Sequence, residues 1–227
     1  MKEIGIIFST PMVQAIRENR KSMTRRICKD IPDHDFKWGL DKKPYIGSIT
    51  LFEKTGLRKW DWVTHENQWL YDLQTAVDDS KTYLLNCPYG QKGDRLFVKE
   101  TWKIEGIDPV NFTMLIRYKE EGELKTAQFT EERFEKFRKF YQKNGWQSPY
   151  FMPKEAARLW LDNEGVRVER LQDISDRDIT KEGIVDVSGF GLRYHFKTLW
   201  EHLNAKRGHG WEQNDWLWVV SFRRSDA

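Results

Sequence analysis

The chain has few of the features that mark secreted or membrane proteins. Its only two cysteines, Cys28 and Cys87, are too far apart for a CxxC unit, so neither a disulfide framework nor a structural zinc site is indicated. No run approaches the ~18 apolar residues of a membrane span. The apolar stretch at positions 4–8 is too short for a signal peptide. These absences predict a cytoplasmic protein that has no membrane partner.

Charge of one sign is not in excess either, because 38 basic and 35 acidic residues leave a formal net charge of +3. Apolar residues make up only 39% of the chain, but eleven Trp, thirteen Phe and eight Tyr are present. Each of these side chains can bury on the order of 150–250 Å², so a packed core is expected rather than disorder. Surplus Trp and Tyr also offer faces on which nucleobases can stack, although core and rim packing explains most of them.

Positive charge is instead concentrated near the start of the chain. Six basic side chains lie within thirteen positions, with two hydroxyls among them: Arg17, Arg20, Lys21, Ser22, Thr24, Arg25, Arg26 and Lys29. The cluster follows a short amphipathic helix that we expect to begin at Thr10 as N-cap, with Pro11 in its first position, and to end at a left-handed Asn19. A folded element therefore holds the cluster, which begins in the next loop.

Hydrophobic patterns predict strands at 4–8, 95–101, 111–118, 166–169 and 216–222, and helices at 130–143, 175–183 and 192–203. Phe134, Phe137 and Tyr141 share the expected apolar face of the helix at 130–143. The pattern weakens over about 31–84, and the segment at about 119–149 also has the character of an insertion. An α+β fold follows, built on a mixed, partly closed β-barrel with capping helices, in a single domain over 1–227.

Lys21 and Thr24, three residues apart, suggest a base and its nucleophile. A Thr hydroxyl attacks only if a neighbouring group accepts its proton, and a Lys amine can do so only if burial or nearby cations lower its pKa. Two other interpretations stay open: a phosphate-binding loop in which Lys21 stays charged, and a solvated run of charge at a helix end.

Glu182 is the next candidate, at the end of a short helix capped by Ser175 and Asp178 and closed by Gly183. If its carboxylate faced Lys21, it would anchor the amine but would also raise the pKa of Lys21. An ionised structural pair is the alternative interpretation.

The C-terminal third offers weaker signals. His195, His202 and His209 are spaced by seven residues, about 10 Å on a helix, which is too far for a shared metal. No metal site or cofactor is therefore expected. The loop at 204–211 carries Lys206 and Arg207 and ends in Trp211. It would present backbone amides to phosphate and an indole to a base, or it is an ordinary loop whose Trp fills one end of the barrel.

Four segments in the same order resemble the ASCH domain, a family of the PUA-like β-barrel superfamily, and in particular its longer phage and prophage members. They are 20–24 (RKSMT), 92–98 (KGDRLFV), 171–175 (LQDIS) leading to Glu182 and Gly183, and 216–222 (WLWVVSF). The resemblance covers about 1–30, 85–118 and 150–224.

The resemblance implies a small mixed barrel with a cleft for RNA, a nucleoside or a modified nucleobase. Some short bacterial members are N(4)-acetylcytidine amidohydrolases that use a Lys, a Thr and a Glu, and the matching positions here are Lys21, Thr24 and Glu182. By this resemblance, Thr24 would be the nucleophile, Lys21 its base, and Glu182 the residue that orients Lys21 and handles the proton of the leaving amine. Arg25 and Arg26 beside Thr24 suit a substrate that carries phosphate.

Three functions are therefore open. The preferred one is hydrolysis of an amide on an acylated cytosine base, after binding through the 17–29 cluster. The second is a non-catalytic module that binds RNA or a modified base. The third is a phage accessory protein that binds another protein through its two insertions.

Overall fold

The computed structural model describes residues 1–29, 87–120 and 124–225, together with the backbone of 45–46, 61–65, 68–73 and 81–85. Its centre is a five-stranded sheet with the order β1-β7-β11-β12-β2. These strands are β1 (Glu3–Ile7), β7 (Arg95–Lys99), β11 (Trp160–Arg170), β12 (Trp216–Arg224) and β2 (Met23–Ile27). β1 pairs with β7 in parallel, and the other three pairings are antiparallel. The expected mixed sheet in an α+β fold is confirmed.

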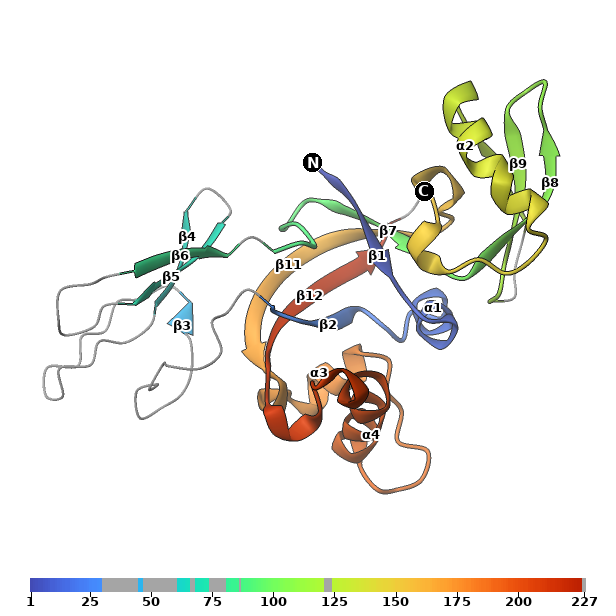
Figure 1. Ribbon diagram of the computed structural model, residues 1–227. Helices are drawn as coiled ribbons and strands as arrows, with labels where there is room; N and C mark the ends of the chain where they lie inside the picture. Colours follow the sequence, from blue (N-terminus) through green and yellow to red (C-terminus); the bar gives the residue numbers. More distant parts are fainter. Residues whose placement is uncertain are drawn as a thin grey trace, which may run out of the picture.

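β12 lies between β11 and β2, and six of its nine side chains are apolar and buried, from Trp216 to Val220 and again at Phe222. Successive side chains point to opposite faces. Val220 and Phe222 therefore join an apolar cluster on one face, while Leu217 joins a second cluster on the other. The sheet is strongly curved along β11 and β12 (Figure 1).

The two edge strands of the sheet, β1 and β2, approach each other without pairing. Arg26 of β2 donates from Nη2 to the Ile7 carbonyl of β1 at 2.5 Å, and its guanidinium lies 5.2 Å from the centre of the Phe8 ring. No backbone ladder joins β1 to β2 within the described chain. A side chain, rather than strand pairing, therefore connects the two edges.

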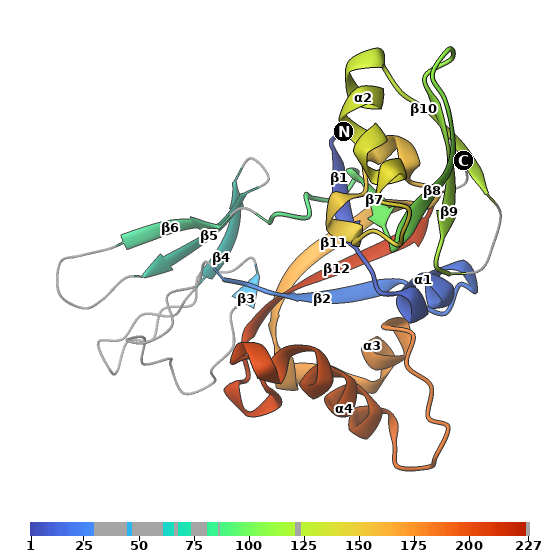
Figure 2. The ribbon, with the colours of Figure 1, turned by 45° about the vertical axis from the view of Figure 1, so that its right-hand side comes forward.

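Helices cover both faces of the sheet. α1 (Thr10–Arg17) packs its Val13 and Ile16 into the cluster that holds Phe8 and Val220. α3 (Asp176–Lys181) and α4 (Leu192–Asn204) cover the other face with Ile179, Phe196 and Trp200, and they lie together below β2 in Figure 2. Single 3₁₀ turns lie at η3 (Leu171–Asp173), η4 (Ala205–Arg207) and η5 (Trp211–Gln213).

A second sheet, of three strands, forms a separate layer. β8 (Trp102–Asp108), β9 (Thr113–Tyr118) and β10 (Lys125–Gln128) are antiparallel, and α2 (Glu131–Gln142) packs on them. Short 3₁₀ turns, η1 (Pro149–Phe151) and η2 (Lys154–Ala156), lead back to β11. This layer begins at Trp102, so it is larger than the insertion expected at 119–149, and β8 and β10 were not anticipated.

The expected apolar face of α2 is partly wrong. Phe134 and Phe140 are buried and Phe137 is partly buried, whereas Tyr141 is 38% exposed. Phe140 faces the Trp102 ring, with ring centres 5.6 Å apart. The position of Trp102 on the sheet decides which helical face is covered, and the helix alone does not contain that information.

Within the other expected insertion, 31–84, the structure describes only strand backbones, and the rest of that segment lies outside the described residues. β3 (Tyr45–Ile46), β4 (Asp61–His65), β5 (Gln68–Leu73) and β6 (Lys81–Leu85) form a four-stranded sheet in that order. Among the helices that the structure describes, none has the length and apolar character needed to cross a bilayer.

Candidate functional site

The connection between α1 and β2 places Lys21 beside the sheet. The helix has its N-cap at Ser9, one residue earlier than expected, and Asn19 adopts the expected left-handed conformation with φ of 58°. The amides of Arg20 and Lys21 then both donate to the Ala15 carbonyl, at 2.8 and 3.0 Å, which closes the last turn. From Met23 the chain is an edge strand. The expectation of a basic loop is therefore wrong beyond residue 22, because residues 23–27 pair with β12.

Glu182 reaches the same place from α3. Ser175 caps this helix, as expected, by accepting from the Asp178 amide at 3.2 Å. Glu182 is the C-cap, and Gly183 turns the chain with φ of +87°. A Cβ on Gly183 would lie 3.2 Å from the Cβ atoms of both Ala15 and Lys21, so glycine permits this close approach as well as the turn. Lys21 and Glu182 form an isolated antiparallel β-bridge there.

The side chains of Lys21 and Glu182 form a buried ion pair. Lys21 Nζ lies 2.6 Å from Glu182 Oε2 and also donates to the Glu182 carbonyl at 3.0 Å. The two side chains are 1% and 7% exposed. Burial lowers the pKa of Lys21, although the carboxylate of Glu182 acts in the opposite direction. The convergence of these two residues, expected from the sequence, is observed.

Arg25 extends this pair into a buried network. Its guanidinium contacts Glu182 at 3.1 Å, Glu169 of β11 at 2.6 Å and Asp178 of α3 at 3.3 Å. Arg167 of β11 contacts the last two carboxylates as well. Burial disfavours the charged form of Arg25, but the nearby carboxylates outweigh it and raise its pKa. Three cations and three anions thus compensate one another.

This network was missed in part from the sequence. Arg25 was a candidate phosphate ligand, but its side chain is only 1% exposed. Glu169, Asp178 and Arg167 were not candidates at all. The available signal was strand alternation: Arg25 pairs with Val219, and Val219 pairs with Arg167, so these side chains share one face of the sheet.

Thr24 lies on the opposite face of β2 from Arg25. Thr24 is 2% exposed and pairs with Val220 of β12. Val220 belongs to the apolar cluster that contains Phe8. Lys21 Nζ borders the same cluster, 5.8 Å from the centre of the Phe8 ring. In the part of the chain that the structure describes, no hydrogen bond joins Thr24 to Lys21 or Glu182.

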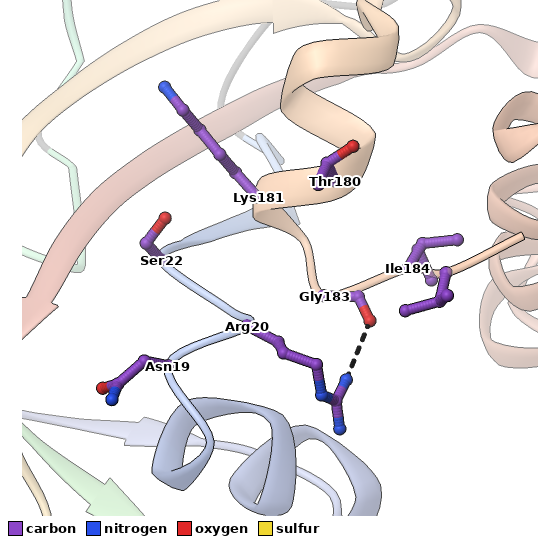
Figure 3. A pocket seen from close by; sticks show the side chains of 8 residues that line it. Asn19, Arg20, Ser22, Thr180, Lys181, Gly183 and Ile184 are labelled. Carbon is purple, nitrogen blue, oxygen red and sulfur yellow. Dashed lines mark hydrogen bonds between the residues drawn. The ribbon is translucent and has the colours of Figure 1, made fainter.

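Two hollows flank the segment from Asn19 to Ser22. One, of about 310 Å³, is lined by Arg20, Thr180 and Lys181, among others (Figure 3). In Figure 3 the guanidinium of Arg20 is turned toward the Gly183 carbonyl, to which it donates at 3.3 Å. The second hollow, of about 230 Å³, is lined by the following residues: Ile16, Asn19, Lys21, Ser22, Glu164, Phe222, Arg223 and Arg224. Asn19 and Ser22 line both, so Ser22 is the hydroxyl of the basic cluster nearest to open space.

The remaining basic candidates are dispersed. Arg17 pairs with Glu120 at 2.6 Å, Arg20 pairs with the exposed Glu18, and Arg26 is held at the edge of β1. Lys206 and Arg207 are exposed on η4.

Trp211 packs in the core and is not a stacking platform for a base. It is 7% exposed and joins the apolar cluster under α4. Its ring lies 6.2 Å from that of Phe196. The indole is therefore part of the core on this face and does not stand at the surface.

One further cluster has the composition of a hydrolase triad but not its geometry. Ser188 Oγ and Asp186 Oδ1 both contact the same nitrogen of His195, Nε2, at 3.0 Å. A triad needs the carboxylate and the hydroxyl on different ring nitrogens. Asp186 also accepts from three amides of the 188–191 turn, so the cluster closes a loop. No group of three metal-ligating side chains is found in the described segments.

Compared with models of protein families, with curated proteins and with solved structures, the chain gives no match.

Proposed function

We propose that this protein binds a nucleobase or nucleotide beside the Lys21–Glu182 pair and hydrolyses an amide on an acylated base of the N(4)-acetylcytosine kind. The observation that supports this most is the buried Lys21 amine, 2.6 Å from Glu182 Oε2, on a residue that lines the smaller hollow. Burying a Lys–Glu pair generally gives little stability in return, and ionisable groups with perturbed pKa values gather at functional sites.

The proposed chemistry needs a neutral Lys21 amine. Burial lowers its pKa, which increases the fraction able to accept a proton. Thr24 Oγ1 attacks the acyl carbon while its proton passes to Lys21 Nζ. The C–N bond then breaks, and the same proton leaves with the amine of the base. Water finally releases the acyl group from Thr24. Glu182 holds the amine in position, and Arg25 contacts the other oxygen of Glu182 at 3.1 Å.

The finer description of the fold belongs to the same proposal. A partly closed barrel of the PUA-like, ASCH type is supported by the curvature of the main sheet (Figure 1) and by the Arg26–Ile7 bond between its edges. Within this proposal, a substrate would enter beside the 19–22 segment, because Asn19 and Ser22 line both hollows.

A second function, binding without catalysis, is favoured by one specific observation. Thr24 lines neither hollow, whereas Ser22, Arg20 and Lys181 line the larger one. These three groups donate hydrogen bonds or carry positive charge, as binding of a nucleotide phosphate requires. An adaptor role through the insertions rests on no contact in the described residues and keeps the status of a sequence prediction.

Acetate release from N(4)-acetylcytidine separates the first two functions. We expect Thr24→Val and Lys21→Met to abolish release, and the control Thr198→Val, which removes an exposed hydroxyl of α4 that lines neither hollow, to retain it. Circular dichroism confirms that each variant is folded. Full turnover by folded Thr24→Val would remove Thr24 from the mechanism. If the wild type binds the nucleoside without releasing acetate, the binding module is the function.

A further inference from the structure

Away from the 19–22 segment, two exposed aromatic rings lie together with two lysines. Tyr150 and Phe151 are 70% and 50% exposed. Large exposed aromatic groups gathered in one place generally mark a binding surface. We call these two rings, together with the two lysines near them, the aromatic–lysine surface: Tyr150, Phe151, Lys99 and Lys143.

Direct contacts hold this surface together. Lys99 Nζ lies 5.6 Å from the centre of the Tyr150 ring. Lys99 also donates to the Tyr150 carbonyl at 2.6 Å. The rings of Tyr150 and Phe151 are 5.2 Å apart and nearly perpendicular, so their faces point in different directions.

The surface continues onto α2. Phe151 lies 5.8 Å from the buried Phe140 ring, and Lys143 Nζ lies 5.6 Å from that ring. Within the described residues, neither Lys99 nor Lys143 pairs with a carboxylate. Both ammonium groups are therefore available to an anionic partner.

From this arrangement we infer that the aromatic–lysine surface binds a single strand of nucleic acid. Such a strand carries flat bases and phosphates, and this surface offers exposed rings together with ammonium groups. Base–aromatic stacking and backbone charge are the two interactions by which proteins hold single strands without reading their sequence.

The surface is separate from the candidate site. Lys99 points to the opposite face of β7 from Val98, which packs in the cluster that holds Phe8. The inference goes beyond the proposed function and does not require it, because none of these four residues lines either hollow.

The test is binding of a fluorescently labelled oligouridylate of about 12 nucleotides, within the range of site sizes of single-strand binders, followed by anisotropy. The double variant Tyr150→Ala, Phe151→Ala should bind at least about tenfold more weakly. The matched control is Phe190→Ala, Tyr194→Ala, an equally exposed aromatic pair 5.2 Å apart. No cation lies over either control ring among the described residues, so this variant should bind as the wild type does.

A second measurement uses the lysines. Lys143→Gln should reduce the slope of log affinity against log salt by about 0.7, the value for one phosphate contact on a single strand. Equal losses in both double variants, or no loss in either, would overturn the inference. Binding to phosphatidylserine vesicles without binding to the oligonucleotide would assign the surface to membranes. Neither measurement uses acetate release, so failure of the proposed hydrolysis leaves this test unaffected.

Discussion

Lys21 and Glu182 are 161 positions apart in the chain, yet they contact each other through both backbone and side chains. The bridge between their backbones brings the amine within 2.6 Å of the carboxylate. A second cation, Arg25, holds the other oxygen of Glu182 at 3.1 Å. Glu182 therefore has two buried cationic partners. Removing Lys21 should abolish the proposed activity without leaving the carboxylate unpaired, so its effects on activity and on stability can be separated.

Removing the amine tests this separation. In Lys21→Met, Glu182 keeps its contact with Arg25, so the carboxylate is not left without a cation. We expect the free energy of unfolding to fall by less than the about 3–5 kcal/mol typical of breaking a buried pair, measured by urea denaturation. A loss beyond that range would mean that Arg25 does not compensate Glu182.

Removing Arg25 should be more damaging. Arg25→Met leaves Glu169, Asp178 and Glu182 with less compensation in a buried setting, and we expect a loss of about 3–5 kcal/mol in the free energy of unfolding. The control Arg20→Met removes an exposed cation of the same cluster and should change stability far less. Similar losses in the two variants would contradict the buried network.

Gly183→Ala tests the close approach of the two segments. A left-handed alanine costs about 1–2 kcal/mol, and the new Cβ would also press on Ala15 and Lys21 at 3.2 Å. Gly189→Ala is the matched control, because Gly189 has φ of +75° and no atom within 4 Å of its added Cβ. Thermal denaturation should show the larger loss at Gly183. Equal losses would mean that backbone conformation alone requires glycine there.

The pH dependence of stability follows from the lowered pKa of Lys21. Burial holds that pKa below its usual 10.5 in the folded chain. Between the folded and unfolded pKa values, the unfolded chain binds more protons at this residue, so stability rises with pH. We expect the free energy of unfolding of the wild type, relative to Lys21→Met, to increase as pH rises toward 10.5. A decrease over that window would show that the attraction of Glu182 exceeds the effect of burial.

Trp211 should behave as a core residue. Trp211→Ala removes a 7% exposed indole from the cluster under α4, and the expected loss is about 3–5 kcal/mol in the free energy of unfolding. Trp211→Phe should recover most of it. A stable Trp211→Ala variant with weakened oligonucleotide binding would instead favour the stacking role.

Local features of this fold could be predicted from the sequence because they depend on residues a few positions apart. Pro11 and Asn19 marked the first helix to within about one residue, and Ser175 and Gly183 marked the short helix that ends at Glu182. Their backbone preferences act within a single turn. The pairing of Lys21 with Glu182 was expected only because a family resemblance placed them together.

Strand faces were harder to predict, since they depend on partners elsewhere in the chain. The segment from Met23 to Ile27 is strongly basic, but pairing with β12 makes it an edge strand whose Thr24 and Arg25 face opposite sides. The charge pattern contains no information about that partner, so Arg25 looked exposed. The same holds for β10, whose sequence shows little alternation but whose place in the second sheet stabilises it. β8 does alternate apolar and polar residues over 102–105, so that signal was present in the sequence and was missed.

Composition and local pattern alone therefore determined that this chain folds as α+β, where its helices at 10–17 and 176–181 lie, and that cationic groups follow the first of them. Tertiary structure decided which of those cations remain accessible. Burial between a sheet and two helices sets Lys21 and Arg25 against carboxylates from β11 and α3. A charge moved from water into a protein interior must find an opposite charge there, and only the folded chain brings that partner near.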